Sequence, residues 1–490
     1  MKFGLTGEII AGIQQVFETN SKVDKAFIFG SRAKGNFKDG SDIDIAIKGQ
    51  ELSFKDIISL SGKLQDLEIP YKIDLIDYST LKEPALLEHI DRVGIEFYSR
   101  WKESILTEMG TLQRGKSKHR PRYAFHLYGG PYPFIQTGQI REASKYISKY
   151  EQTYSEDGLA QSKLWKKGTL CITIAANIAE IAILGMDACF PDSVLGFIPN
   201  KKKCDLDFAF YTLKHFQREL QQMGDGSVQD NINLGTFTQI KFPFPPLPEQ
   251  TAISSILSSL DDKIDLLQRQ NKTLEQLAET LFRQWFVKEA EESWEVEKLG
   301  KVFDIGIGRT PPRKEQHWFT TNPNDIKWVS IKDMGISGIY IDTVSEYLTP
   351  QAVDVYSVPI IPENTVMLSF KMTIGRLAIS TEKMVSNEAI AHFKQKESSS
   401  LFPEFLYLFL KTYSWVELGS TSSIVESINS QMIKEIEMII PNKEKLISFK
   451  ETIKPNFDKI KSNQTQIRTL TQTRDTLLPK LMSGEVRVNL

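Results

Sequence analysis

Residues 262–281 read DKIDLLQRQNKTLEQLAETL, and residues 458–477 read DKIKSNQTQIRTLTQTRDTL. The two stretches share ten residues in register, each pair 196 positions apart. A constant offset of this length indicates an internal repeat. Weaker matches at nearly the same offset extend the similarity upstream. Residues 101–290 and 294–490 are therefore predicted to be two copies of one unit, and residues 1–98 lie outside both.

Apolar residues alternate at spacings of four and three along each stretch, which is the seam of a coiled coil. The seam runs from Ile253 to Trp285 in the first copy and from Phe449 to Leu481 in the second. Polar seam residues select one specific pairing at some expense in stability. This group consists of Asn271, Asn456 and Asn463.

The two helices are predicted to pair in antiparallel orientation. A parallel pair would force the second globular part to bridge a helix about 57 Å long. An antiparallel pair places the two globular parts at opposite ends, with a pseudo-two-fold between them. Pro455 is expected to kink or interrupt the second helix near its start.

The length of 490 residues favours about three domains, since one domain has ~150 residues. Before each helix lie short β-branched and aromatic runs broken by Gly, Pro and Asn, which indicate mixed α/β domains. The predicted fold class is α/β and α+β multidomain: an N-terminal domain, then two globular domains joined by two long antiparallel coiled-coil helices. The predicted boundaries are 1–98, 101–248, 249–290, 291–441 and 442–490.

Composition excludes several classes of protein. Lys and Arg total 60 against 62 Asp and Glu, so the chain as a whole does not attract phosphate, and a nucleic-acid surface must be a local patch. Three cysteines without paired spacing predict neither a disulfide framework nor a zinc site. The start of the chain has no long apolar run and no membrane span is expected, so a cytoplasmic location is predicted.

Basic residues cluster locally in both globular domains, with aromatic residues between them. Such clusters suit contacts with DNA phosphates, although a solvated surface charge is an equally good reading of any single residue. The candidate DNA-binding residues are Arg114, Lys116, Lys118, Arg120, Arg309, Arg313 and Lys314. No cofactor is expected for this part of the chain.

Several short motifs in the doubled part resemble the specificity (S) subunit of type I restriction-modification systems. These motifs are Pro246–Gln250 at the start of the first helix, Leu477–Glu485 at the end of the second, Cys189–Val194 and Gly308–Pro311. The resemblance implies two target recognition domains that read a bipartite sequence in double-stranded DNA. It also implies that the helices dock methylation (M) subunits, two in number, and recruit a restriction (R) subunit.

The chain carries no recognisable chemistry for cutting or methylating DNA. No Asn-Pro-Pro-aromatic methylation signature and no metal-nuclease acid cluster ending in Lys is present. Gly110–Ser117 satisfies the P-loop expression, but no apolar strand precedes it, and the second copy does not keep its Lys and Ser. Nucleotide binding is therefore not predicted at this position.

A separate candidate site lies in residues 1–98. An apolar run at residues 26–29 leads into Gly30, Ser31 and Arg32, and Asp42 and Asp44 follow on one face of a second predicted strand. A third carboxylate, Asp74, lies in another apolar run. Hard carboxylate oxygens on one face predict a metal site for Mg²⁺.

This pattern resembles the minimal nucleotidyltransferase domain of the polymerase-β-like superfamily, from about residue 8 to Tyr98. The resemblance implies that Asp42 and Asp44 hold two Mg²⁺ ions and that Asp74 orients or activates the attacking hydroxyl. Gly30 and Ser31 would cradle the phosphates of a nucleoside triphosphate, and Arg32 or Lys34 would be available to stabilise their charge. A copy without activity is an open alternative.

Two functions follow from these resemblances. The first is a DNA-recognition subunit of a type I restriction-modification complex with a fused nucleotidyltransferase. The alternative is a nucleotidyltransferase of the antitoxin kind, acting on a toxin or another acceptor, that the doubled domain targets to DNA. Whether the chain is itself an enzyme depends on residues 1–98.

Overall fold

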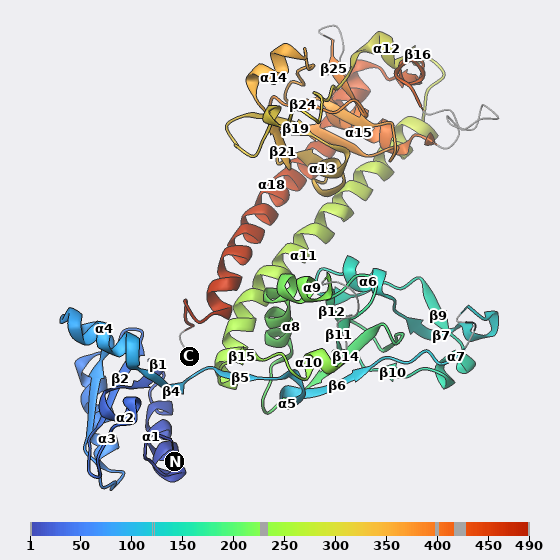
Figure 1. Ribbon diagram of the computed structural model, residues 1–490. Helices are drawn as coiled ribbons and strands as arrows, with labels where there is room; N and C mark the ends of the chain where they lie inside the picture. The colour runs from blue at the N-terminus through green and yellow to red at the C-terminus, as the bar shows by residue number, and fades with distance from the viewer. Residues whose placement is uncertain are drawn as a thin grey trace. The chain divides into compact units, whose positions relative to one another are not determined.

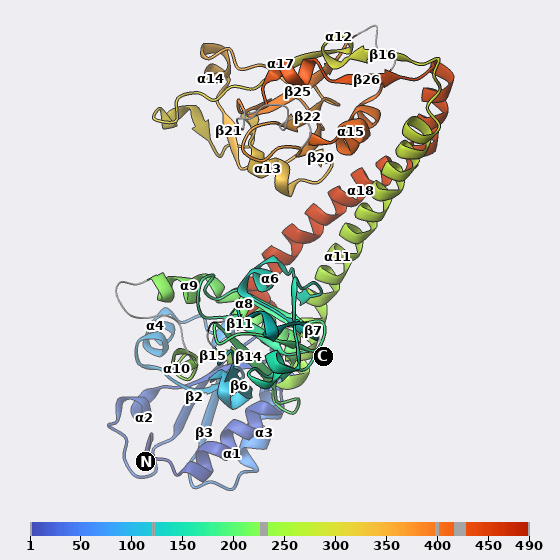
Figure 2. The ribbon, with the colours of Figure 1, turned by 90° about the vertical axis from the view of Figure 1, so that its right-hand side faces the viewer.

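The computed structural model describes residues 2–119, 121, 123–225, 234–396, 401–415 and 428–488. The chain forms two compact units, one of Met1–Ser259 with Asp475–Leu490 and the other of Leu260–Arg474. Figures 1 and 2 show the elements from two directions. None of the helices in these ranges is long and apolar enough to cross a membrane.

The N-terminal domain is a four-stranded sheet with helices packed on it. The strand order is β3-β2-β1-β4, and β2 runs parallel to β3 while the other pairs are antiparallel. Helix α1 (Gly7–Glu18) starts at an Thr6 N-cap, and α3 (Phe54–Gln65) starts at a Ser53 capping box. Their apolar faces close a core with the sheet. The strands are β1 (Val23–Ile28), β2 (Ile43–Gly49), β3 (Ile73–Asp77) and β4 (Ile95–Ser99).

The first repeat contains a large sheet in the order β6-β14-β11-β12-β8 and a small sheet in the order β10-β13-β7-β9. The large sheet comprises β6 (Gly110–Arg114), β14 (Val194–Pro199), β11 (Leu170–Thr173), β12 (Ile181–Leu184) and β8 (Tyr146–Ile147). The small sheet comprises β10 (Leu164–Trp165), β13 (Ala188–Cys189), β7 (Tyr128–Phe134) and β9 (Gln152–Tyr154).

The central strand β11 is buried on both faces, which explains its unbroken apolar sequence. Leu170 and Ile172 pack with Phe208 of α8 (Leu206–His215), whereas Cys171 packs on the other face with Trp165. The three cysteines, Cys171, Cys189 and Cys204, are buried and free, as their spacing predicts.

The second repeat has the same large sheet, in the order β17-β25-β22-β23-β20, with α15 (Pro403–Thr412) packed against it. Its small sheet has the order β18-β21-β19-β24. The large sheet comprises β17 (Phe303–Ile307), β25 (Ile390–Gln395), β22 (Val366–Ser369), β23 (Leu377–Ser380) and β20 (Tyr340–Ile341). The small sheet comprises β18 (Phe319–Thr320), β21 (Glu346–Leu348), β19 (Ile326–Val329) and β24 (Val385–Ser386).

Each repeat closes on a two-stranded antiparallel ribbon at the root of its long helix. In the first repeat, β5 (Lys102–Ser104) pairs with β15 (Phe242–Phe244). In the second, β16 (Glu295–Lys298) pairs with β26 (Glu437–Ile440). The chain therefore enters and leaves each globular domain at the same place, directly before the helix.

The long helices are α11 (Leu247–Arg283) and α18 (Lys443–Met482). Asn463 donates a hydrogen bond to Asn271 at 2.8 Å, while Phe282, further along α11, lies against Phe449, earlier in α18. This order shows that the helices are antiparallel and that the polar seam residues meet. Pro455 does not interrupt the second helix, so that part of the expectation is wrong. Helix α18 continues through it, because Ile453 and Phe457 on either side are buried in the core.

Candidate functional site

The three predicted carboxylates come from two neighbouring strands of the N-terminal domain. Asp42 is exposed in the last residue before β2, and Asp44 is the second residue of β2. Strands β2 and β3 pair in parallel register with Asp44 opposite Asp74. The structure therefore places Asp44 and Asp74 side by side at the start of both strands, with Asp42 one step outward on the same face.

The carboxylates repel one another. Burial raises the pKa of Asp44, and the charges of Asp74 and Asp42 raise it further, while Lys72 and Arg32 oppose them. Lys72 also pairs with Asp74, with 2.6 Å between Nζ and Oδ1. In the described residues no three acidic, His or Cys side chains are gathered closely enough to enclose a metal ion. The donor set is nevertheless one of hard oxygens, and a cation would relieve the repulsion.

The turn before these carboxylates requires glycine at position 30. Gly30 opens the short helix α2 (Gly30–Lys34) with φ of +71°, a conformation that side chains disfavour. A Cβ at this position would lie 2.2 Å from Oδ2 of Asp44. The bare backbone of Gly30 and the half-buried Ser31 thus lie directly beside the carboxylates. This close approach fits a turn that holds phosphates next to a metal site.

Arg32 does not occupy the place that the resemblance implies. Its side chain is 3 % exposed, and its guanidinium donates hydrogen bonds to the carbonyl oxygens of Phe3, Ser41 and Asp42. The guanidinium also stacks 4.3 Å from the ring centroid of Tyr71. Its donors are thus directed into the domain, where they hold the loop that carries Asp42. Arg32 supports the carboxylates and is not available to a phosphate.

The predicted DNA-binding residues fall into two groups. Three arginines are tied to the protein itself: Arg114 donates to the carbonyl of Asp192, Arg309 donates to that of Tyr356 at 2.6 Å, and Arg313 makes two 2.9 Å hydrogen bonds to Glu346. The lysines are exposed, at positions Lys116, Lys118 and Lys314. Arg120 lies outside the described residues.

Gly110–Ser117 is not a phosphate-binding loop. Its first five residues form the edge strand β6 of the large sheet, paired with β14, and the next helical element among the described residues is the 3-10 turn Phe125–Leu127. The P-loop requires a loop that ends in a helix N-terminus directly after a strand. The described residues of this stretch lack that arrangement.

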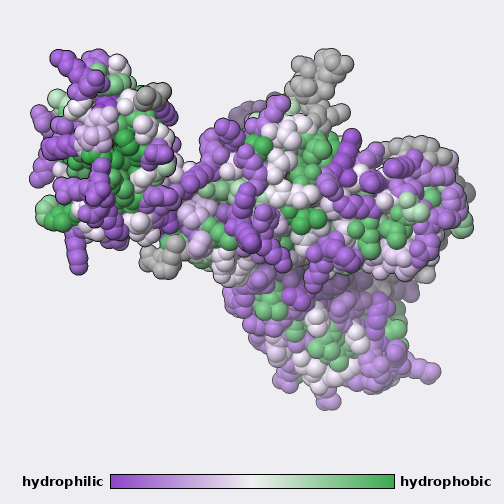
Figure 3. Space-filling model, turned by 90° about the horizontal axis from the view of Figure 1, so that it is seen from below, coloured by the Kyte–Doolittle hydropathy of each residue, from purple (hydrophilic) through white to green (hydrophobic). Residues whose placement is uncertain are grey.

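Two exposed aromatic residues of the first repeat are absent from the sequence-based candidates. Tyr123 is 81 % exposed and Phe125 is 96 % exposed, both in the segment before β7. The two residues lie on either side of Ala124, directly after a basic stretch that contains a proline, so no long apolar run marks them. The stretch HRPRYAFH at residues 119–126, basic and aromatic together, is the only signal that the sequence offers. Hydrophilic residues cover most of the surface visible in Figure 3, with small separate hydrophobic patches.

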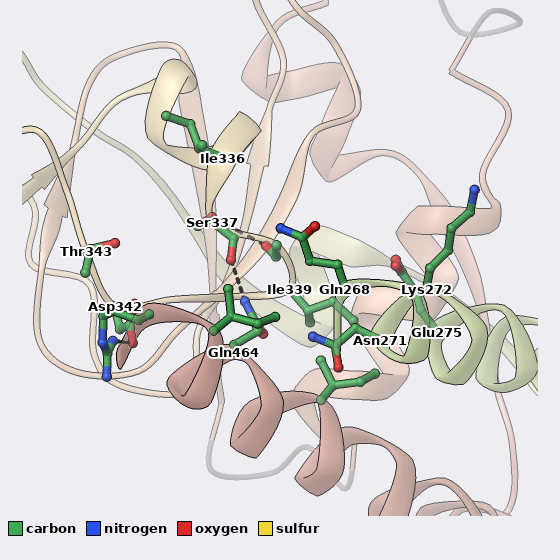
Figure 4. A pocket seen from close by; sticks show the side chains of 14 residues that line it. Gln268, Asn271, Lys272, Glu275, Ile336, Ser337, Ile339, Asp342, Thr343 and Gln464 are labelled. Atoms are coloured by element: carbon green, nitrogen blue, oxygen red, sulfur yellow. Dashed lines mark hydrogen bonds and ion pairs between the residues drawn. The ribbon is translucent and has the colours of Figure 1, made fainter. Parts of the chain in front are cut away.

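A pocket of about 340 Å³ lies in the second unit between the long helices and the segment at residues 336–343. Figure 4 shows the Gln464 side chain reaching from α18 to this segment. Its amide donates to the carbonyls of Ser337 and Tyr340 and accepts from the Tyr340 N–H. Gly338, at φ of +76°, leaves the space that this amide occupies. The pocket therefore lies where Gln464 ties the second globular domain to α18.

Comparison with known proteins separates the same two parts of the chain. Residues 98–276 and 291–472 match the family of the type I restriction modification DNA specificity domain. Residues 12–103 match the polymerase beta nucleotidyltransferase family.

Relatives agree with this division. The type I restriction enzyme MjaIX specificity subunit of Methanocaldococcus jannaschii is 27 % identical over 395 residues, covering 74 % of this chain and 88 % of the relative. The crystal structure of the type I restriction-modification system S subunit from M. genitalium shares the fold, with a TM-score of 0.51 at 16 % identity over 80 % of this chain and 96 % of that chain. The probable protein adenylyltransferase MntA of Haemophilus influenzae is 39 % identical over 56 residues, which are 11 % of this chain and about half, 49 %, of the relative.

Proposed function

This chain belongs to the type I restriction modification DNA specificity family, and we propose that its two recognition domains each read one half of a bipartite DNA target. The observation that carries the proposal is the repeat itself. The large sheet of each copy has the same strand order, and each copy is followed by one helix of an antiparallel pair. Two similar readers on a rigid spacer suit two half-sites at a fixed separation.

The proposed domains are residues 1–98, 101–248, 249–290, 291–441 and 442–490. Within this organisation the helices would dock two methylation subunits and recruit a restriction subunit, which supply the chemistry that the chain lacks. The exposed lysines Lys116, Lys118 and Lys314 would contact phosphates. Arg114, Arg309 and Arg313 would act by shaping the loops beside these contacts, since their guanidiniums are bonded to the protein.

Selection from random DNA tests the bipartite target. The full chain, purified with its methylation subunits, is incubated with a pool of randomised duplexes, and the bound duplexes are sequenced. We expect two short conserved blocks separated by a spacer of constant length and free sequence. A single uninterrupted block, or no enrichment, would contradict the proposal.

We further propose that residues 1–98 are a Mg²⁺-dependent nucleotidyltransferase domain. Asp42 and Asp44 would hold the metal, Gly30 and Ser31 would position the triphosphate, and Asp74 would accept the proton of the attacking hydroxyl. Bound Mg²⁺ would neutralise the charge that develops on the phosphates. Support comes from the parallel register of Asp44 with Asp74 and from the close approach of Gly30 to Asp44.

Transfer of a labelled nucleotide tests this second function. The wild-type chain with Mg²⁺ and labelled ATP should label a protein acceptor, either itself or a co-encoded partner such as a toxin. The double variant Asp42→Asn with Asp44→Asn keeps the shape of both side chains and should abolish labelling. Asp39→Asn, an exposed acid nearby, is the matched control. Labelling that persists in the double variant would eliminate this site, and an inert wild-type chain would favour a copy without activity.

The alternative, a nucleotidyltransferase that the repeat merely targets to DNA, predicts different neighbours in the genome. Adjacent genes for methylation and restriction subunits favour DNA recognition as the main function. An adjacent small toxin gene without them favours the alternative.

A further inference from the structure

We propose that Tyr123 and Phe125, hereafter the aromatic tip, insert between bases of the DNA and give the first recognition domain a stacking contact with no counterpart among the described residues of the second. The proposal rests on the proposed DNA-reading function and adds a mode of contact to it. Family membership assigns no such role to these residues.

The residues on either side of the aromatic tip are anchored to the domain. The rings of His119 and His126 meet edge to face, with centroids 5.0 Å apart. Two hydrogen bonds tie these histidines to the residues that flank α7 (Glu156–Ala160): Gln161 accepts from the His119 N–H, and Ser155 donates to the His126 carbonyl at 2.6 Å. The two exposed rings therefore lie between two anchored histidines.

Exposed phenylalanine is unfavourable in water unless a partner covers it. Burying a side chain of this size is worth more than most polar contacts, and a ring that is 96 % exposed gains almost none of that free energy in the free protein. A ring of this kind gains this burial free energy when it stacks on a flat apolar face. Nucleic-acid bases offer such faces, and stacking on them is tolerant of sequence.

The surrounding charge selects a polyanion as the partner. Lys116 and Lys118 are exposed on the strand side of the segment, and Lys163 lies near Lys116 with its ammonium 3.7 Å from the Trp165 ring centroid. Burial lowers the pKa of Lys163, and the charge of Lys116 lowers it further. The carboxylate of Glu156 on the same side is bonded to the Tyr132 hydroxyl. Cations beside exposed aromatics are the combination that duplex DNA fits, because the cations meet phosphates while the rings meet bases.

The second domain arranges the corresponding segment differently. Its short helix before the small sheet is Gln316–Trp318, where the first domain has Phe125–Leu127. The Trp318 indole donates to Glu315 at 2.7 Å and packs edge to face on Tyr356. The aromatic side chain of this segment is thus folded onto its own domain. Among the described residues, stacking is therefore expected from the first domain alone.

Equilibrium binding of a labelled duplex tests the aromatic tip. The probe is the duplex that the wild-type full chain, with its methylation subunits, selects from a randomised pool, and the affinity is measured over a series of salt concentrations. Phe125→Ala should weaken binding about tenfold, the size of one lost base stack, and should leave the salt dependence unchanged. Phe125→Trp should bind like the wild type. Phe54→Ala removes a ring that is 80 % exposed in the N-terminal domain and is the matched control.

The outcomes separate the inference from the function it rests on. A wild-type chain that selects no duplex would contradict the proposed function and, with it, the aromatic tip. Wild-type binding with Phe125→Ala equally tight would overturn the inference and leave the function standing. A weaker Phe125→Ala whose salt slope also falls, or one that Phe125→Trp does not rescue, would show that the substitution disturbs the phosphate contacts and would likewise overturn it. Circular dichroism of each variant confirms the fold.

Discussion

The two recognition domains agree in one sheet and differ in the other. Their large sheets match strand for strand, β6-β14-β11-β12-β8 against β17-β25-β22-β23-β20. In the small sheets, β13-β7-β9 matches β24-β19-β21, but the first domain adds β10 beside β13, while the second adds β18 beside β21. The duplicated core has thus kept its topology, and the variation lies in the small sheet. This division suits the proposal that the two domains read different half-sites.

The junction between each domain and its long helix, here called the root, also differs between the two domains. In the first, Glu249 pairs with the Arg100 guanidinium at 2.7 Å and accepts from the Trp101 indole, with both charged side chains under 10 % exposed. In the second, the matching Trp294 indole N–H is buried without a hydrogen-bond partner among the described residues. Asn442 instead accepts from the Lys445 N–H at the start of α18. The first root is held by a buried ion pair, whereas the second has a helix cap and an ion pair between Lys298 and Glu435 that is nearly half exposed.

The largest expected effect concerns the seam that both copies share. Leu260, Ile264 and Leu267 lie on this seam. Replacing all three with Gln removes about 1.5–3 kcal/mol of burial free energy for each fully buried side chain. We expect the variant to lose co-purification with the methylation subunits while residues 1–98 stay folded. The measurement is affinity purification followed by limited proteolysis.

The matched control for the seam replaces exposed apolar residues outside the long helices with Gln. Phe54, Ile336 and Val355 are 80 %, 72 % and 64 % exposed. This variant should assemble normally. A seam variant that still forms a stable complex would show that the helix pair is not held by these contacts.

The next effect separates the two roots. Glu249→Gln leaves the Arg100 guanidinium buried without its counter-charge, which should lower the free energy of unfolding of the first unit by about 3 kcal/mol. The comparable change in the second domain, Glu435→Gln, breaks an ion pair whose side chains are nearly half exposed, and should have a much smaller effect because solvent screens this pair. Urea denaturation of both variants measures the difference. Equal losses would refute the distinction between the roots.

A smaller effect depends on pH. Burial lowers the pKa of His392 in β25 to about 4, with Lys394 adding to the shift, whereas the matching residue of the first domain is Gly196. Unfolded His titrates near pH ~6.5, so between these values the unfolded state binds the extra proton. The buried neutral imidazole therefore contributes to the free energy of unfolding. This contribution is fully present above pH ~6.5, and it is lost as the pH falls toward 4, by at most about 3 kcal/mol.

The test follows the urea midpoint of the second unit against pH. His392→Leu should remove this part of the pH dependence, while His317→Leu, at an exposed position, should not. An unchanged slope in His392→Leu would show that the buried imidazole is not the titrating group.

The features that follow from spacing were predictable from the sequence. The 196-residue offset identified the repeat, and the seam from Ile253 to Trp285 is buried or half-buried at each predicted position. Asn271 and Asn463, predicted to set the pairing, are hydrogen-bonded to each other. Local periodicity determines these features, so one sequence suffices to find them.

The features that depend on distant partners were not predictable. Arg32 and Arg313 look alike as isolated cations, but carbonyl groups of the N-terminal domain enclose the first and Glu346, 33 residues away, binds the second. Trp318 and Phe125 likewise differ in exposure because Glu315 and Tyr356 surround only one of them. Folding decides which surface groups are already occupied, and sequence spacing does not record it.

The central claim is that each recognition domain reads its own half-site. Exchanging residues 101–248 for the corresponding domain of a relative, followed by methylome sequencing of cells that carry the hybrid with its methylation subunits, tests it directly. The repeat predicts that one half of the bipartite site changes while the other half and the spacer stay the same. A change in both halves, or in neither, would contradict the account.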